Sequence, residues 1–191
     1  SSQALKETIR VELRQQRAEG QTIAAVSPGN YGLDFMQQTY GYDLDRSVKC
    51  SNFIGETIDM AAELGFCAML LTGHIGKLIK VAGGIMNTHS HTADCRTELF
   101  CTHAALCGAD AATCRALMDA ATTDACLDIL DAAQLREPVM ASLLTAIQLH
   151  LDRRAAGAFR VGAVLFSNQA GPLGQTETAA QLLQSWQKKE Q

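Results

Sequence analysis

The sequence has few aromatic residues, no excess of positive charge and no long apolar run, and each shortage excludes a class of function. Aromatic side chains make up 5% of the 191 residues, which leaves little for base-stacking surfaces. Sixteen basic against twenty acidic residues give a net charge of −4, the opposite of what a phosphate-backbone binder needs. The longest apolar run, Phe66 to Leu71, is far short of the roughly 20 residues that cross a bilayer. We therefore expect neither a nucleic-acid nor a membrane partner.

Cys-x-x-Cys pairs are absent, although the chain has seven cysteines. The odd count and the alanine-rich surroundings of several of them favour free thiols that pack as small apolar groups. Free thiols indicate a reducing compartment, so a cytoplasmic location is expected. Ser1 to Gly20 is charged and carries Leu5, Ile9 and Leu13 at i+4 spacing, which predicts an amphipathic helix and not a signal peptide.

Strand and helix patterns alternate through the first half of the chain. Buried-strand patterns occupy Thr22–Ser27, Ser47–Cys50 and Phe66–Thr72. Helical spacing follows over Phe53–Leu64, and again from the turn after the third strand to about Met86. Such recurrence of strand, turn and helix is typical of βαβ units and a parallel sheet.

The second half begins with a purely helical stretch. Residues from Thr92 to Ala156 show no strand pattern, and breaks at Gly108 and Pro138 predict four helices. Phe159–Phe166 returns to strand character, and the last helix places four apolar residues on one face: Ala179, Leu182, Leu183 and Trp186. The sequence thus predicts one α/β domain over residues 1–191. Its expected fold is three-layer and Rossmann-like, with a short, mostly parallel sheet and a helical insertion at about 92–156.

Four polar turns, three of which contain glycine, are expected at one edge of this sheet. They are Pro28–Gly32, Cys50–Gly55, Gly73–Lys77 and Asn87–His91. Ligands of open parallel sheets bind outside the carboxyl ends of the strands, so four such turns favour a nucleotide-like ligand over ordinary turn chemistry. The turn beginning at Gly73 is not a phosphate loop, because only two residues separate its glycines and Leu78 follows the lysine. No Gly-x-Gly-x-x-Gly follows the first strand either.

The densest polar cluster runs from Asn87 to Glu98. Its possible metal ligands are His89, His91, Asp94 and Cys95. A helix starting near Thr92 would place Asp94 and Glu98 one turn apart on the same face, with Asp94 in the positive first turn. A metal-dependent hydrolase using His89, His91 and Asp94 is therefore one alternative. No second cluster supplies remote ligands, which favours a site without a metal.

These turns, taken in order, resemble successive motifs of one family. The motifs are Ser27–Gly32, Lys49–Glu56, Gly73–Val81, Gly84–Ser90 and Ala93–Glu98, with weaker similarity through 121–125, 165–168 and 171–174. In these motifs the chain resembles the CbiD family, the cobalt-precorrin-5B C1-methyltransferases of anaerobic cobalamin biosynthesis.

The resemblance implies an enzyme that transfers a methyl group from S-adenosylmethionine to C1 of a cobalt-containing tetrapyrrole, cobalt-precorrin-5B, and gives cobalt-precorrin-6A. It also implies that family members carry a substantial N-terminal portion before the segment that Ser1 to Ile9 resembles. That portion is absent from this sequence and is an expected partner. A non-catalytic ligand-binding module is a further alternative, and the sequence leaves open whether the chain forms a homo-oligomer.

Residue type and placement assign roles within this framework. The turns expected to bind S-adenosylmethionine contribute Gly29, Asn30, Gly32, Ser51, Asn52, Gly55, Gly73 and His74. Residues expected to bind the carboxylate-bearing tetrapyrrole are Lys77, Lys80, Asn87 and Arg96. Candidate acid/base groups are His89, Glu98 and, if its pKa is raised, Asp94.

Overall fold

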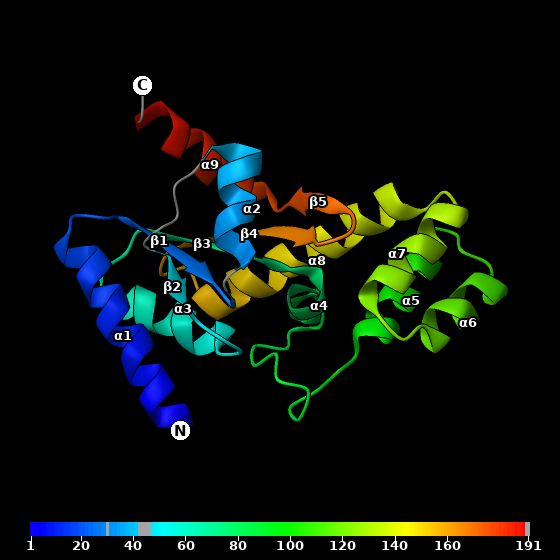
Figure 1. The fold of residues 1–191 in the computed structure, drawn as a ribbon, viewed down its shortest axis with the longest axis horizontal. Coiled ribbons are helices and arrows are strands. Elements are labelled where there is room, and N and C mark those ends of the chain that lie inside the picture. The colour runs from blue at the N-terminus through cyan, green and yellow to red at the C-terminus, as the bar shows by residue number, and fades with distance from the viewer. Residues whose placement is uncertain (30, 42–46, 190–191) are drawn as a thin grey trace.

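A five-stranded, mostly parallel sheet organises the part of the chain that the structure describes. The structure is a computed structural model that describes residues 1–29, 31–41 and 47–189 (Figure 1). The strands are β1 (Ile23–Ser27), β2 (Val48–Lys49), β3 (Ala68–His74), β4 (Arg160–Ser167) and β5 (Gly171–Gln175). They lie in the order β2-β1-β3-β4-β5, and only β5 is antiparallel to its neighbour. The predicted α/β class with a mostly parallel sheet is confirmed.

Helices cover both faces of the sheet because the strands are buried on both sides. Facing side chains alternate along β1, where Ala24 and Val26 pack into one core and Ala25 packs into the other. On the first face lie α1 (Ser2–Ala18), α3 (Ile54–Glu63) and α8 (Arg136–Ala155), and on the second lie α2 (Tyr31–Tyr40) and α9 (Glu177–Lys189). The predicted three layers are confirmed.

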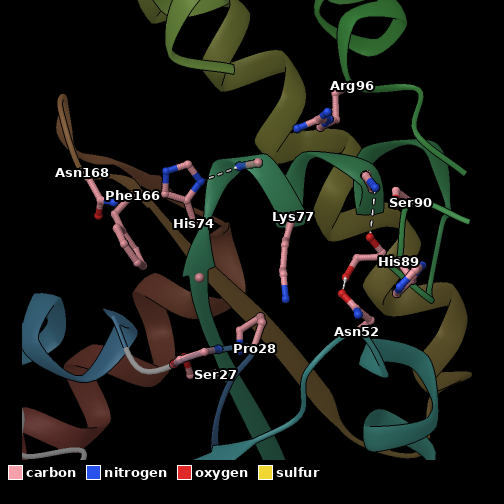
Figure 2. A pocket seen from close by; sticks show the side chains of 15 residues that line it. Ser27, Pro28, Asn52, His74, Lys77, His89, Ser90, Arg96, Phe166 and Asn168 are labelled. Atoms are coloured by element: carbon pink, nitrogen blue, oxygen red, sulfur yellow. Dashed lines mark hydrogen bonds between the residues drawn. The ribbon is translucent and has the colours of Figure 1, made fainter. Parts of the chain in front are cut away.

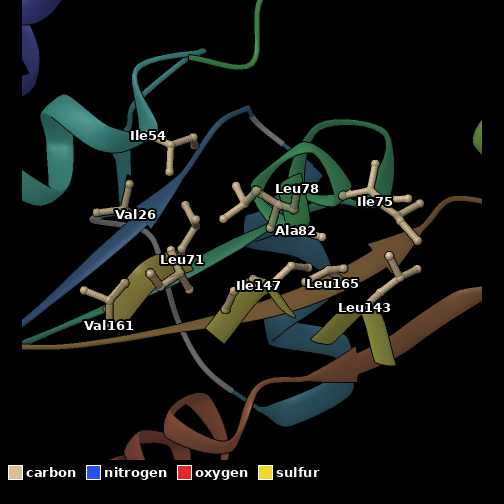
Figure 3. Packing of buried hydrophobic residues seen from close by; sticks show 14 of the residues in the cluster. Val26, Ile54, Leu71, Ile75, Leu78, Ala82, Leu143, Ile147, Val161 and Leu165 are labelled. Carbon is tan, nitrogen blue, oxygen red and sulfur yellow. The ribbon is translucent and has the colours of Figure 1, made fainter. Parts of the chain in front are cut away.

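The larger core lies between the sheet and α8. Leu71 of β3 and Val161 and Leu165 of β4 face Leu143 and Ile147 of α8, as Figure 3 shows, and all five side chains are buried. These contacts hold the carboxyl ends of β3 and β4 in place, and the site described below lies at those ends. The apolar face of α8, which carries Leu143 and Ile147, is therefore part of the core.

Four helices make up the predicted helical region; the first three gather at one end of the molecule, and the fourth runs from that end along the sheet (Figure 1). They are α5 (Arg96–Leu106), α6 (Ala111–Asp119), α7 (Thr123–Ala132) and α8. Side-chain caps start two of them: the Asp110 carboxylate accepts from Thr113 N at 2.8 Å, and Thr122 Oγ1 accepts from Ala125 N at 3.0 Å.

Three expectations about single elements are wrong. The helix predicted to run to about Met86 is instead a short helix α4 (Ile75–Leu78) followed by a 3₁₀ helix η1 (Ile79–Gly83), since Gly84 has φ of 77° and ends the helix. The helix predicted from about Thr92 begins at Arg96, because Cys95 has φ of 57° and lies in the left-handed region. The turn expected at Pro28–Gly32 passes into α2 at Tyr31.

The strand order β2-β1-β3 creates a topological switch point between β1 and β3. The chain passes from β1 to β2 on one side, and β3 then pairs with β1 on the other side. Sheets of this order bind ligands at that switch point, outside the carboxyl ends of the strands. The topology therefore points to the ends of β1 and β3, at Ser27 and His74.

Candidate functional site

A cavity of about 880 Å³ opens at the switch point (Figure 2). Strand ends and the segments after them supply its lining: Ser27, Pro28 and Gly29 after β1, Asn52 after β2, Gly73, His74, Gly76, Lys77 and Lys80 around β3, α4 and η1, Thr88, His89, Ser90 and Arg96 before and at the start of α5, and Phe166 and Asn168 around the end of β4. We call it the main cavity. Its volume lies within the range of small-molecule sites, about 300–1,000 Å³.

The main cavity brings together more than half of the residues expected to form the site. Those that line it are Gly29, Asn52, Gly73, His74, Lys77, Lys80, His89 and Arg96. Those outside its lining are Ser51, Gly55, Asn87, Asp94 and Glu98, while Gly32 lies in α2. Asn30, also expected to bind S-adenosylmethionine, lies outside the described residues.

Local packing explains why some expected residues stand away from the cavity. A side chain at Gly55 would meet Arg154 and the Met86 Cβ at 2.8 Å, so this glycine serves the packing of α3. Ser51 occupies a turn with φ of 52°. The side-chain oxygen of Asn87 accepts from His89 N at 3.0 Å and shapes the turn that follows it.

Histidine 74 presents one defined face to the main cavity. Its Nδ1 accepts the N–H of Gly76 at 2.9 Å, which caps α4, so the neutral ring carries its proton on Nε2. Burial lowers the pKa of His74, and the charge of Asp124 opposes this shift. The edge of the ring packs against Phe166 with centroids 5.9 Å apart. His74 is therefore a neutral hydrogen-bond donor next to an aromatic wall.

The segment before α5 is held against the start of α3. Thr88 donates from its N–H to the Asn52 carbonyl and from Oγ1 to Asn52 Oδ1, both at 3.0 Å (Figure 2). An antiparallel bridge joins Phe53 and Asn87, and Gly55 N donates to the Met86 carbonyl. The last bond occupies an N–H at the start of α3, in one of the turns expected to bind S-adenosylmethionine.

His89 is positioned in the same way as His74. Its Nδ1 accepts the N–H of His91 at 3.0 Å, and its carbonyl accepts the N–H of Thr92 at 2.9 Å. The neutral ring therefore carries its proton on Nε2 and can act as a hydrogen-bond donor to a ligand.

Two lysines that are three residues apart have different environments. Lys80 is 4% exposed, and its Nζ donates to the carbonyls of Thr88 and Ala93 at 2.9 and 3.0 Å. Burial lowers the pKa of this ammonium. Lys77 extends into the main cavity (Figure 2) and has no ion pair or hydrogen bond within the described part of the chain. Lys80 thus stabilises the segment before α5, whereas Lys77 is available to a ligand.

Arg96 is held by a two-point ion pair at the boundary of the cavity. Asp94 accepts from Arg96 Nε at 2.7 Å and from its terminal nitrogen at 3.3 Å. These hydrogen bonds lower the pKa of Asp94, so the condition under which it could act as an acid at neutral pH is not met. Asp94 lies before α5, not in its first turn, and therefore does not share a helix face with Glu98. Its carboxylate lines a second, smaller cavity of about 150 Å³ together with Arg96.

The histidines, cysteines and carboxylates do not assemble a metal site within residues 1–29, 31–41 and 47–189, where no three such side chains could hold one ion. The hydrolase alternative therefore has no support here. All seven cysteines are unpaired. Two are buried, and burial raises the pKa of Cys50 to about 12, so its thiol stays protonated beside the cavity.

Seven lining residues have no role assigned from the sequence: Ser27, Pro28, Gly76, Thr88, Ser90, Phe166 and Asn168. Phe166 and Asn168 mark the carboxyl end of β4, which the same strand-end rule could have identified. Thr88 and Ser90 lie within the predicted Asn87–His91 turn.

No helix in the described ranges has both the length and the apolar character to cross a bilayer.

Comparison with known proteins finds relatives that share one name and a family model of the same family. Residues 87–177 match the family model described as CbiD, C-terminal domain. A cobalt-precorrin-5B C(1)-methyltransferase of Ruminiclostridium cellulolyticum is 46% identical over 168 residues, which are 88% of this chain and 44% of that protein. The protein of the same name from Tolumonas auensis is 35% identical over 188 residues, 97% of this chain and 50% of the relative.

A third relative of that name, from a Thermoanaerobacter species, is 42% identical over 133 residues, 70% of this chain and 36% of its own length. The chain therefore spans about half the length, or less, of the curated relatives it matches. No solved structure matches it significantly.

Proposed function

We propose, on the premise that the chain belongs to the CbiD family, that it contributes to methylation of C1 of cobalt-precorrin-5B with S-adenosylmethionine as the methyl donor. The observation that carries the proposal is the main cavity, which lies at the β1/β3 switch point and is lined by residues of the motifs that resemble those of the family. S-adenosylmethionine supplies an electrophilic methyl group, and methyl transfer depends mainly on holding that group in line with the ring carbon. The protein's contribution is therefore positioning.

The sheet side of the main cavity suits the methyl donor. Gly73 lets Pro28 and Leu78 pack closely at the floor of the cavity, because a side chain there would meet Pro28 Cδ and Leu78 at 3.1 Å. Gly29 adds backbone without a side chain, and His74 offers a neutral Nε2–H for a hydrogen bond. Phe166 completes an apolar wall. Backbone, a neutral ring and a phenyl group can enclose an adenosyl group without burying an unpaired charge.

The opposite side suits the carboxylates of the tetrapyrrole. Lys77 brings an ammonium into the cavity, and Arg96 brings a guanidinium that Asp94 holds in one orientation. Because a guanidinium binds carboxylates at two points, Arg96 is the stronger orienting group of the two. In this proposal Asp94 is a positioning residue for Arg96.

His89 is the remaining candidate for proton transfer. A ring that carries its proton on Nε2 can donate a hydrogen bond to the substrate but cannot accept a proton at that atom without a change of tautomer. We therefore assign His89 to substrate binding or proton donation. Glu98 stays outside the proposal, because it lies in α5 and hydrogen-bonds to Thr97 Oγ1 at 3.2 Å.

Calorimetric titration with S-adenosylmethionine and with S-adenosylhomocysteine tests binding by the purified chain, and mass spectrometry after incubation with cobalt-precorrin-5B tests methyl transfer. We expect binding to weaken about tenfold or more for the tetrapyrrole in Arg96→Met. The control variant is Arg115→Met, which removes an exposed arginine of α6 outside both cavities.

The outcomes separate the alternatives. Binding without turnover, restored to turnover by adding the rest of a full-length relative, would show a ligand-binding portion of the enzyme. Absence of binding to either ligand, by the chain and by the chain combined with that remaining segment, would refute the proposal. Stoichiometric zinc, iron or manganese in the purified protein would instead revive the hydrolase alternative.

A further inference from the structure

The main cavity has a strongly one-sided charge. Three of its lining residues are cationic side chains, Lys77, Lys80 and Arg96, and none of the described residues that line it is Asp or Glu. The whole chain has the opposite bias, with 20 acidic against 16 basic residues. The positive lining is therefore a local feature of the site.

Neighbouring groups compensate these three charges to different degrees. Asp94 neutralises Arg96 from outside the lining, at 2.7 Å. Lys80 has two carbonyl acceptors but no carboxylate partner within the described part of the chain. Lys77 has neither. The Asp94 carboxylate also attracts the Lys80 ammonium. Three cations against this one carboxylate leave a net charge of two positive units at the main cavity.

Such a lining affects the two proposed ligands in opposite ways. The carboxylates of a tetrapyrrole are attracted to it, whereas a sulfonium ion enters against two like charges in a medium less polar than water. Once carboxylates occupy the lysine side, the same sulfonium meets a neutralised or negative surface. S-adenosylhomocysteine has no sulfonium charge, so its binding should depend much less on whether carboxylates occupy the lysine side.

We propose that the polycarboxylate substrate binds before the methyl donor and raises the affinity of the site for the sulfonium form of that donor. The proposal rests on the function proposed above and adds the order of binding and its electrostatic cause. Linkage requires the converse as well: S-adenosylmethionine strengthens binding of the tetrapyrrole by the same factor. After transfer, loss of the sulfonium charge removes that coupling and favours release of the product.

Calorimetry on the wild-type chain tests the coupling directly. S-adenosylmethionine and S-adenosylhomocysteine are each titrated into the chain alone and into the chain saturated with cobyrinic acid, a cobalt corrinoid with free carboxylates. We expect about a tenfold gain in affinity for S-adenosylmethionine and less than a twofold gain for S-adenosylhomocysteine. Cobyrinic acid esterified at all its carboxylates should produce neither gain. Raising the salt concentration should shrink the first gain.

Lys77→Met gives a test in which two effects have opposite signs. Loss of the ammonium should weaken cobyrinic acid about tenfold and strengthen S-adenosylmethionine binding to the free chain about threefold. Disrupted structure would weaken both ligands, so the opposite signs separate an electrostatic role from a structural one. The charge-matched control is Arg115→Met, which should change neither affinity.

Each remaining outcome has a defined meaning. Equal gains for the sulfonium and the neutral sulfide, or no gain for either, would overturn the proposed order while leaving the methyltransferase function intact. Equal weakening of S-adenosylmethionine and S-adenosylhomocysteine by Lys77→Met, with the affinity for cobyrinic acid unchanged, would show that this lysine holds the carboxylate of the methyl donor, which also overturns the proposed order. Failure of both to bind under any condition would refute the proposed function itself and the binding order with it.

Discussion

Lys80 offers the sharpest test of how the site is assembled. The substitution is Lys80→Met, which keeps the aliphatic stem and removes the ammonium that donates to the Thr88 and Ala93 carbonyls. Lys77→Met is the matched control, because it makes the same chemical change one helical turn away at an ammonium without hydrogen bonds in the described structure.

The expected size of the effect follows from the two bonds and the burial. A hydrogen bond from a charged donor contributes about 1.5–3 kcal/mol, so the pair contributes about 3–6 kcal/mol. Burial of the ammonium costs several kcal/mol, part of which the methionine recovers. We expect the free energy of unfolding to fall by about 2–3 kcal/mol, or Tm by roughly 4–12 °C for a chain of this size. Lys77→Met should change it by less than about 0.5 kcal/mol.

The loss should also be local. Without Nζ the segment from Thr88 to Ala93 loses the bonds that hold its two ends, so it should open more often than the sheet. Circular dichroism measures Tm, and limited proteolysis with mass spectrometry locates the first cleavage, which we expect within this segment. Equal Tm values for the two variants, or first cleavage elsewhere in Lys80→Met, would refute the assignment of Lys80 as a positioning residue.

Two further predictions concern stability. Gly162→Ala would place a Cβ in collision with the backbone nitrogen of Ala179, so α9 must shift, and we expect a loss of about 2–3 kcal/mol in urea unfolding. Gly29→Ala should cost almost nothing, because no atom of the described residues lies within 4 Å of its Cβ. A tolerated Gly162→Ala would contradict the packing of α9 on β4. Because burial lowers the pKa of His74 below its ordinary 6.5, the stability due to the neutral ring is complete above pH 6.5 and is lost as pH falls through the lower folded-state value. In His74→Asn, the side-chain oxygen can still accept the Gly76 N–H and does not titrate. The fall in the free energy of unfolding between pH 6.5 and 5 should therefore be smaller in this variant, and an unchanged pH dependence would count against the role of neutral His74.

The two histidines of the cavity show how much of the site depends on short-range structure. Both rings have Nδ1 occupied by a backbone N–H two residues later, His74 by Gly76 and His89 by His91. The residue types could be selected from the sequence as polar groups in turns. The tautomer, and with it the role as a donor of hydrogen bonds, depends on the turn geometry that the folded chain provides.

Sequence periodicity alone determined the sheet, its parallel core and the edge at which the site lies. Continuous apolar patterns in the strands require burial on two faces, and the polar turns lie at the strand ends where a parallel sheet binds ligands. The edge strand β5, with its Gly171-Pro-Leu-Gly174 sequence, was not predicted, because its local pattern is that of a turn and becomes a strand only through pairing with β4. Helix α2 was not predicted either, because it is stabilised by packing of Met36 into the smaller core.

Only the tertiary structure decided what each selected residue does. Lys77 and Lys80 are equivalent by type and nearly so by position, yet one enters the main cavity and the other is buried under Thr88 and Ala93. The space beside Gly55 is filled by the side chain of Arg154, which is distant in the sequence. Local patterns fix which face of an element is apolar. The partner that reaches a polar atom comes from far along the chain, and its identity depends on the packing of the whole fold.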